Sequence, residues 1–73
     1  MTLKTFRTIR RLSDMTATEF AMEIGVSRQL VNHIEQGRKS ITRTTATKVR
    51  QAFGDDYVNK VEQFIMDTTK GEA

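Results

Sequence analysis

The stretch TATEFAMEIGVSRQLVNHIEQG, at residues 16–37, decides the expected fold. Thr16 can accept a hydrogen bond from the backbone N–H of Glu19, whose side chain can reach back to Thr16, and this reciprocal pattern marks the start of a helix. Gly25 suits the left-handed backbone that ends a helix, and Ser27 is a favoured cap for a following one. The stretch therefore predicts two short helices joined by a sharp turn.

The second of these helices has an apolar side and an unusual polar side. At about 100° per residue, Val31 and Ile34 point the same way. The polar side and the first turn carry Arg28, Gln29, Asn32, His33 and Gln36. A solvent-facing helix more often carries glutamate and lysine. Arginine instead matches the acceptors of guanine in the DNA major groove, and asparagine or glutamine matches adenine. We interpret the helix as a reader of double-stranded DNA, with an ordinary solvated face as the alternative.

Length and composition indicate one small domain held together by helix packing. The 73 residues include no cysteine, which excludes disulfides and thiolate metal sites. No apolar run approaches the ~20 residues that cross a bilayer, and the N-terminus lacks the apolar core of a signal peptide, so we expect a cytoplasmic protein without a membrane partner. We expect a single domain over residues 1–67 and a disordered tail over residues 68–73.

Charge is distributed unevenly along the chain. Residues 1–50 hold ten basic and four acidic residues, a net charge of +6, whereas residues 51–73 hold two basic and five acidic residues, a net charge of −3. The positive part contains the polar helix described above. Because contacts to phosphates supply most of the sequence-independent affinity for DNA, this asymmetry favours a nucleic-acid partner, with ordinary scatter as the alternative.

Apolar periodicity predicts an all-α chain with five helices. The expected ranges are 2–12, 17–24, 28–36, 43–53 and a last helix capped by Asp55 or Asp56. The fourth helix is ambiguous, because the β-branched residues of 41–47 also suit a strand. Val49 and Phe53 recur at helical spacing and Gly54 follows at a position typical of a helix end, which favours a helix capped by Thr42.

Taken together, these residues resemble the Cro/C1-type, or Xre-type, helix-turn-helix family of phage and bacterial repressors. The resemblance covers about residues 3–54 without a gap. It rests on Phe6, Ile9, Arg10, Met15, Thr16, Phe20, Ala21, Ile24, Gly25, Val26, Ser27, Val31, Ile34, Glu35, Gly37, Val49, Ala52, Phe53 and Gly54. It implies a five-helix, lambda-repressor-like DNA-binding domain with the helix-turn-helix at the second and third helices. It also implies a structural ion pair between Arg10 and Glu35, and a carboxylate facing inward at Glu35 would be costly without a cation.

The resemblance also implies which residues contact DNA. The base-reading positions are Ser27, Arg28, Gln29, Asn32 and His33, although a lone histidine such as His33 can equally be a passive surface residue. The family's usual glutamine at the start of the second helix is Ala17 here, so that phosphate contact is left to the backbone N–H groups of Ala17 and Thr18. We interpret Arg38, Lys39 and Arg43 as further phosphate contacts, with plain surface charge as the alternative.

Proteins of this family pair across a two-fold axis, with half-sites about 34 Å apart, because one recognition helix covers few base pairs. We therefore expect a homodimer on a palindromic operator. The expected contact surface comprises the end of the fourth helix and the fifth helix, at Phe53, Tyr57, Val61, Phe64 and Ile65. The alternative is that all five side chains turn inward to close the core.

Catalytic chemistry has little support in the sequence. The single histidine has no cysteine partner, and no glycine-rich phosphate loop is present. We expect no enzymatic activity, no cofactor, no metal and no small-molecule ligand. The expected function is a Cro-like transcriptional repressor. The alternatives are a protein-binding helix-turn-helix module, such as an antitoxin or antirepressor, and a restriction-modification or plasmid controller.

Overall fold

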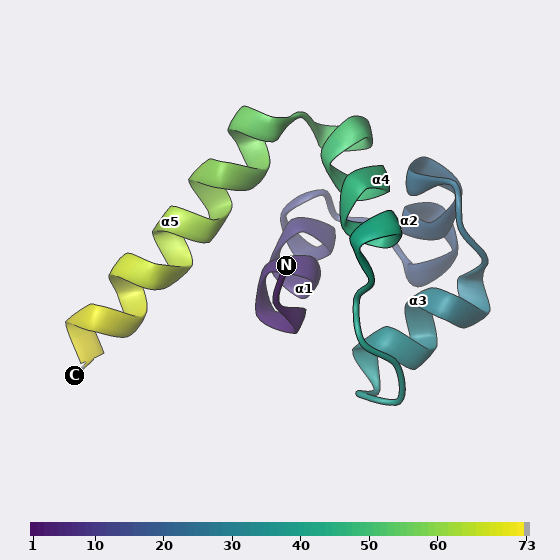
Figure 1. Cartoon of the computed structure of the whole chain (residues 1–73), viewed down its shortest axis with the longest axis horizontal. Helices are drawn as coiled ribbons and strands as arrows, with labels where there is room; N and C mark the ends of the chain where they lie inside the picture. Colours follow the sequence, from purple (N-terminus) through teal and green to yellow (C-terminus); the bar gives the residue numbers. More distant parts are fainter. Residues whose placement is uncertain (73) are drawn as a thin grey trace.

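Five α-helices and no strand are found in residues 1–72, the part of the chain that the structure describes. The structure is a computed structural model, and its side chains are described as far as residue 68. The helices are α1 (Leu3–Leu12), α2 (Ala17–Ile24), α3 (Arg28–Glu35), α4 (Arg43–Phe53) and α5 (Asp55–Glu72). Figure 1 shows α1 to α4 gathered into one body, from which the C-terminal part of α5 extends. The predicted all-α architecture is confirmed, including the helix at 43–53.

The first four helices begin at a threonine or serine cap. In each case the cap hydroxyl accepts a hydrogen bond, 3.1–3.2 Å long, from the backbone N–H three residues later. The caps are Thr2, Thr16, Ser27 and Thr42. Two predicted boundaries shift by one residue because Thr2 caps α1 from outside the helix and Gln36 is the C-cap of α3. Local capping chemistry therefore fixes where these helices start.

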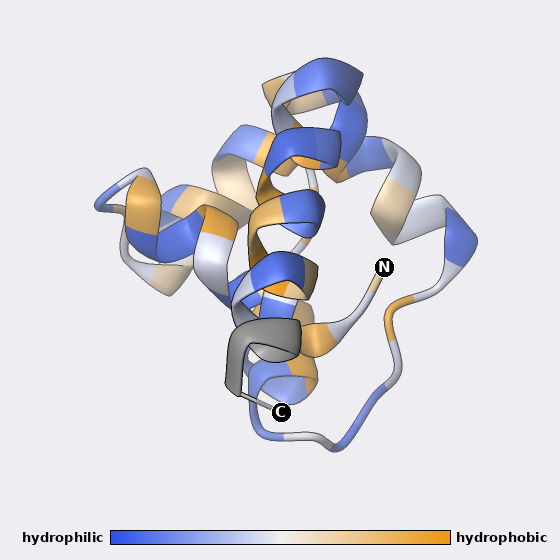
Figure 2. Ribbon diagram, turned by 90° about the vertical axis from the view of Figure 1, so that its left-hand side faces the viewer, coloured by the Kyte–Doolittle hydropathy of each residue, from blue (hydrophilic) through white to orange (hydrophobic). Residues whose placement is uncertain are grey.

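All five helices contribute to one apolar core. Its fully buried large side chains are Phe6, Ile9, Phe20, Val31, Ile34, Val49 and Val58. An aromatic series runs through this core: the ring centroids of Phe6 and Phe20 lie 5.1 Å apart edge to face, and Phe53 stacks on Phe20 at 5.7 Å and on Tyr57 at 6.0 Å. Figure 2 shows hydrophobic and hydrophilic residues alternating along α5, as expected for a helix that packs one side on the body.

Gly54 is the single residue between α4 and α5. Its φ of +92° lies where glycine is favoured, and its carbonyl accepts a 3.1 Å hydrogen bond from the N–H of Val58. The prediction that Asp55 or Asp56 caps α5 is wrong, because the helix starts directly after Gly54. Both aspartates lie in the first turn instead, where negative charge interacts favourably with the helix dipole.

Arg50 fixes the direction in which α5 leaves α4. Its guanidinium contacts three side chains of α5 that lie along one side of that helix. The partners are Asp55 Oδ1 at 3.4 Å, Asn59 Oδ1 at 3.0 Å and Glu62 Oε1 at 2.9 Å. The backbone of α5 continues to Glu72, past residue 67, where we expected the domain to end. The expected disorder over residues 68–73 falls largely outside the described side chains and stays a prediction.

Candidate nucleic-acid interface

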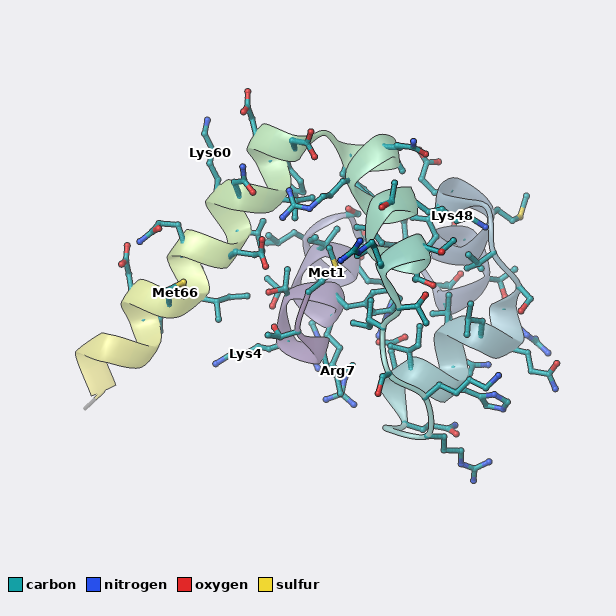
Figure 3. The ribbon with its side chains drawn as sticks, viewed as in Figure 1. Met1, Lys4, Arg7, Lys48, Lys60 and Met66 are labelled. Carbon is teal, nitrogen blue, oxygen red and sulfur yellow. The ribbon has the colours of Figure 1, made fainter. Side chains whose placement is uncertain are left out.

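A left-handed glycine makes the turn between α2 and α3. Gly25 has a φ of +79°, and the N–H groups of Gly25 and Val26 both donate to the carbonyl of Ala21 at 2.9 Å, which closes the end of α2. The carbonyl of Gly25 itself accepts a 3.3 Å hydrogen bond from Lys48 Nζ. Figure 3 shows Lys48 between α4 and the end of α2. The turn is thus stabilised by its own backbone hydrogen bonds and by a side chain of α4.

The faces of α3 agree with the predicted pattern. Val31 and Ile34 are buried, with exposed fractions of 0% and 1%. On the other side, Ser27, Arg28, Gln29 and Gln36 are exposed, while Asn32 and His33 are half-buried. Leu30 packs against the core at the edge of this polar side. Of the five residues predicted to read bases, Arg28 and Gln29 are exposed on α3, Asn32 and His33 are half-buried on it, and Ser27 is its N-cap.

An ion pair ties the end of α3 to α1. Arg10 donates to Oε1 of Glu35 twice, from Nη2 at 2.7 Å and from Nε at 2.9 Å, and a third N–H donates to the carbonyl of Met15 at 3.2 Å. The geometry agrees with the expected structural pair. Sequence reasoning missed Arg7, whose Nη2 donates to the backbone carbonyl of Glu35. The available signal was its spacing, three residues before Arg10 on the same helix.

The loop after α3 places two cations next to that helix. Gly37, with a φ of +79°, reverses the chain, and the N–H groups of Arg38 and Lys39 then donate to the carbonyl of His33 at 2.8 and 3.3 Å. Arg38 and Lys39 are exposed, as is Arg43 in the first turn of α4. The three predicted phosphate contacts thus lie on the surface, two directly after α3 and one at the start of α4.

The carboxylate of Glu19 lies at the start of α2, at the position where a phosphate is predicted to bind. Glu19 Oε1 accepts the N–H of Thr16 at 3.0 Å, and the Thr16 hydroxyl accepts the N–H of Glu19 at 3.2 Å. The backbone hydrogen bond from Thr16, followed by the contact with its hydroxyl, holds the pKa of the Glu19 carboxyl below its usual range. The N–H groups of Ala17 and Thr18, predicted to meet a phosphate, lie next to this carboxylate.

The five residues expected at a dimer surface divide into two groups. Val61 is only 6% exposed and belongs to the core, and Phe53, Tyr57 and Ile65 are half-buried and pack against it. Phe64, by contrast, is 67% exposed. The prediction is wrong for Val61, because this residue lies on the side of α5 that faces the body, and for the other four residues it stays a prediction. Met66, also on α5, is 55% exposed, so Phe64 and Met66 are the exposed large apolar side chains of this helix among the described residues.

No group of histidine, cysteine and acidic side chains able to hold a metal ion occurs among the described residues. Within the same part of the chain, no helix has the length and apolar character needed to span a membrane.

A family model described as helix-turn-helix matches residues 6–54. Comparisons with curated proteins and with solved structures found no match. The matched range begins in α1 and ends at the glycine between α4 and α5, so it contains the turn, α3 and every predicted DNA contact.

Proposed function

Because the chain belongs to the Cro/C1-type helix-turn-helix family, we propose that it is a sequence-specific transcriptional regulator that reads the major groove of double-stranded DNA with α3. The helices that the structure describes form the lambda-repressor-like five-helix fold of this family. We further propose that the protein acts as a repressor in the cytoplasm, as a dimer on a palindromic operator. A family of DNA-binding regulators gives no support to an enzymatic role.

The polar side of α3 is the observation that carries the proposal. Its exposed donors and acceptors project from a helix whose two ends are fixed, at Ser27 by a cap and at Glu35 by two arginines of α1. Fixed ends reduce the conformational entropy lost on binding. A rigid row of Arg28, Gln29 and Asn32 is suited to bidentate hydrogen bonds with base edges.

Selection of the preferred site from a random duplex pool tests base reading. Replacing Arg28 or Gln29 by alanine should then relax the preference at one position each, at guanine for Arg28 and at adenine for Gln29, by about 1–3 kcal/mol, which is about fivefold or more. Gln51→Ala is the matched control, because Gln51 is an exposed glutamine on α4 outside the reading row. The proposal fails if both reading variants keep the full site preference.

Salt dependence separates DNA binding from the protein-binding alternative. Affinity for duplex DNA must fall steeply as the salt concentration rises, because each phosphate contact releases condensed counterions. If the protein binds no DNA duplex of any sequence at low salt, the proposed DNA-binding function is wrong, and the protein-binding alternative, an antitoxin-like or antirepressor-like role, is favoured.

Dimer formation is proposed from the geometry of palindromic sites and from the exposed Phe64. Half-sites about 34 Å apart require two copies whose recognition helices face the same side of the duplex. Phe64→Asp should yield a folded monomer in sedimentation, with weaker operator binding. Met22→Asp, at a 78% exposed apolar residue on α2, is the control and should leave the oligomeric state unchanged. A folded dimeric Phe64→Asp variant would exclude this surface.

A further inference from the structure

We propose that α1 carries a phosphate-binding strip, formed by Lys4, Arg7 and Arg11, that holds the DNA backbone beside the half-site read by α3. This inference rests on the DNA-binding function proposed above. It adds contacts on α1 to those expected from α2, from the loop after α3 and from the start of α4.

The three cations follow one another along one side of α1. Residues three, four and seven positions apart are neighbours on a helix, so Lys4, Arg7 and Arg11 form a row. At 1.5 Å per residue the row is about 10 Å long, and the phosphates of one strand advance about 3.4 Å each along the duplex axis. The row is therefore long enough to meet more than one phosphate of a strand.

Two open hollows of the surface connect this row with the reading side of α3. The first, of about 460 Å³, lies where α1, the start of α2 and the second half of α3 meet. The second, of about 420 Å³, lies along α1, and Arg7 and Arg11 line both hollows. Asn32 and Gln36 of the polar side of α3 line the first one as well. A strand that lies against these two residues thus meets Arg7 and Arg11 next.

The positive charge in the first hollow that is not paired with Glu35 belongs to α1. Ala17, at the start of α2, offers no polar side chain there, and Arg10 is already paired with Glu35. Figure 3 shows Arg7 projecting downward from α1, Lys4 projecting from α1 to the left, below α5, and Lys60 projecting from α5 at the upper left. Arg7 and Arg11 thus reach the hollow shared with α3, and Lys4 continues the row along α1.

The charges of the strip are not compensated within the described residues. None of its three members takes part in an ion pair there. Lys4 and Arg11 are exposed, and Arg7 is half-buried with one N–H fixed on the carbonyl of Glu35. Like charges on neighbouring helix positions repel one another. A polyanion lying along the row would relieve this repulsion, which favours binding without any preference for sequence.

The test measures how affinity for the selected operator depends on salt for Lys4→Gln, Arg11→Gln and the double variant. Each lost phosphate contact lowers the slope of log affinity against log salt by about 0.9. Between about 50 and about 200 mM salt, this makes the fall in affinity about threefold smaller for each single variant and about tenfold smaller for the double variant. Lys60→Gln is the matched control on α5. Arg7 is left unchanged because it also holds α3.

Three results are distinguishable. Lower slopes with an unchanged preferred site and an unchanged unfolding midpoint support the strip. If the α1 variants bind the operator with the same salt slope as Lys60→Gln, the proposed strip is wrong, whereas the proposed DNA-binding function is unaffected. Absence of any salt-sensitive duplex binding by the unmodified protein overturns the function and the strip together.

Discussion

Replacing Arg10 by methionine removes the cation from the pair that fixes the end of the recognition helix. Removing one partner of a buried ion pair costs about 3–5 kcal/mol, because the other charge stays buried without compensation. The side chains of Arg10 and Glu35 are 25% and 13% exposed, so water can reach part of the carboxylate. We therefore expect the free energy of unfolding to fall by about 2–3 kcal/mol. This is a large share of the about 4–10 kcal/mol typical of a domain of this size.

Urea unfolding followed by helical circular dichroism measures this loss. Arg38→Met is the matched control, since Arg38 is exposed in the loop after α3, and it should change the free energy of unfolding by less than about 0.5 kcal/mol. In the double variant with Glu35→Leu, no buried charge is left unpaired, so most of the stability should return. The reasoning is refuted if Arg10→Met costs no more than Arg38→Met, or if the double variant is as unstable as the two single losses added together.

Three further variants test other parts of the fold. Gly25→Ala should cost about 1–2 kcal/mol in urea unfolding, because the added Cβ meets nothing within 4 Å and the left-handed backbone alone opposes it; a neutral result would contradict this. Ile34→Val should cost about 0.5–1.5 kcal/mol by the same measurement, since Ile34 is buried, and a larger loss would indicate rearrangement of α3. The lowered pKa of Glu19 means that its charged form stabilises the fold above the unfolded-state pKa, and that this contribution is lost as the pH falls through the lower folded-state pKa. Unfolding free energies measured against pH should therefore show less loss on acidification for Glu19→Gln than for the unmodified protein, and equal losses would count against the capping box.

Local signals were sufficient for most of the fold. The caps Thr16, Ser27 and Thr42 and the hydrogen bonds that close α2 at Gly25 join residues at most five positions apart, so they can be predicted from the local sequence. The start of α5 could not be predicted in this way, because aspartate is favoured both as an N-cap and in the first turn of a helix. Only the backbone conformation at Gly54 shows that Asp55 and Asp56 lie in the first turn.

Contacts between distant segments were harder to predict. The apolar side of α5 is wide, and sequence alone did not show that Val61 faces the body while Phe64 faces outward. Arg7 and Glu35 are 28 positions apart, and a side chain donating to a backbone carbonyl leaves no pattern in residue types. The polar side of α3 was readable because helical periodicity assigns each residue to a face, but periodicity does not say which nucleotide each residue meets.

The aromatic series through the core gives the protein a built-in optical reporter. The chain has no tryptophan and a single tyrosine, and Tyr57 lies at the outer end of the series, stacked on Phe53 where α5 begins. Its fluorescence is therefore emitted from one place, the corner at which α5 follows α4. Separation of α5 from α4 would change the tyrosine emission while the helix-turn-helix stayed folded. Intrinsic fluorescence can therefore distinguish this local opening from global unfolding.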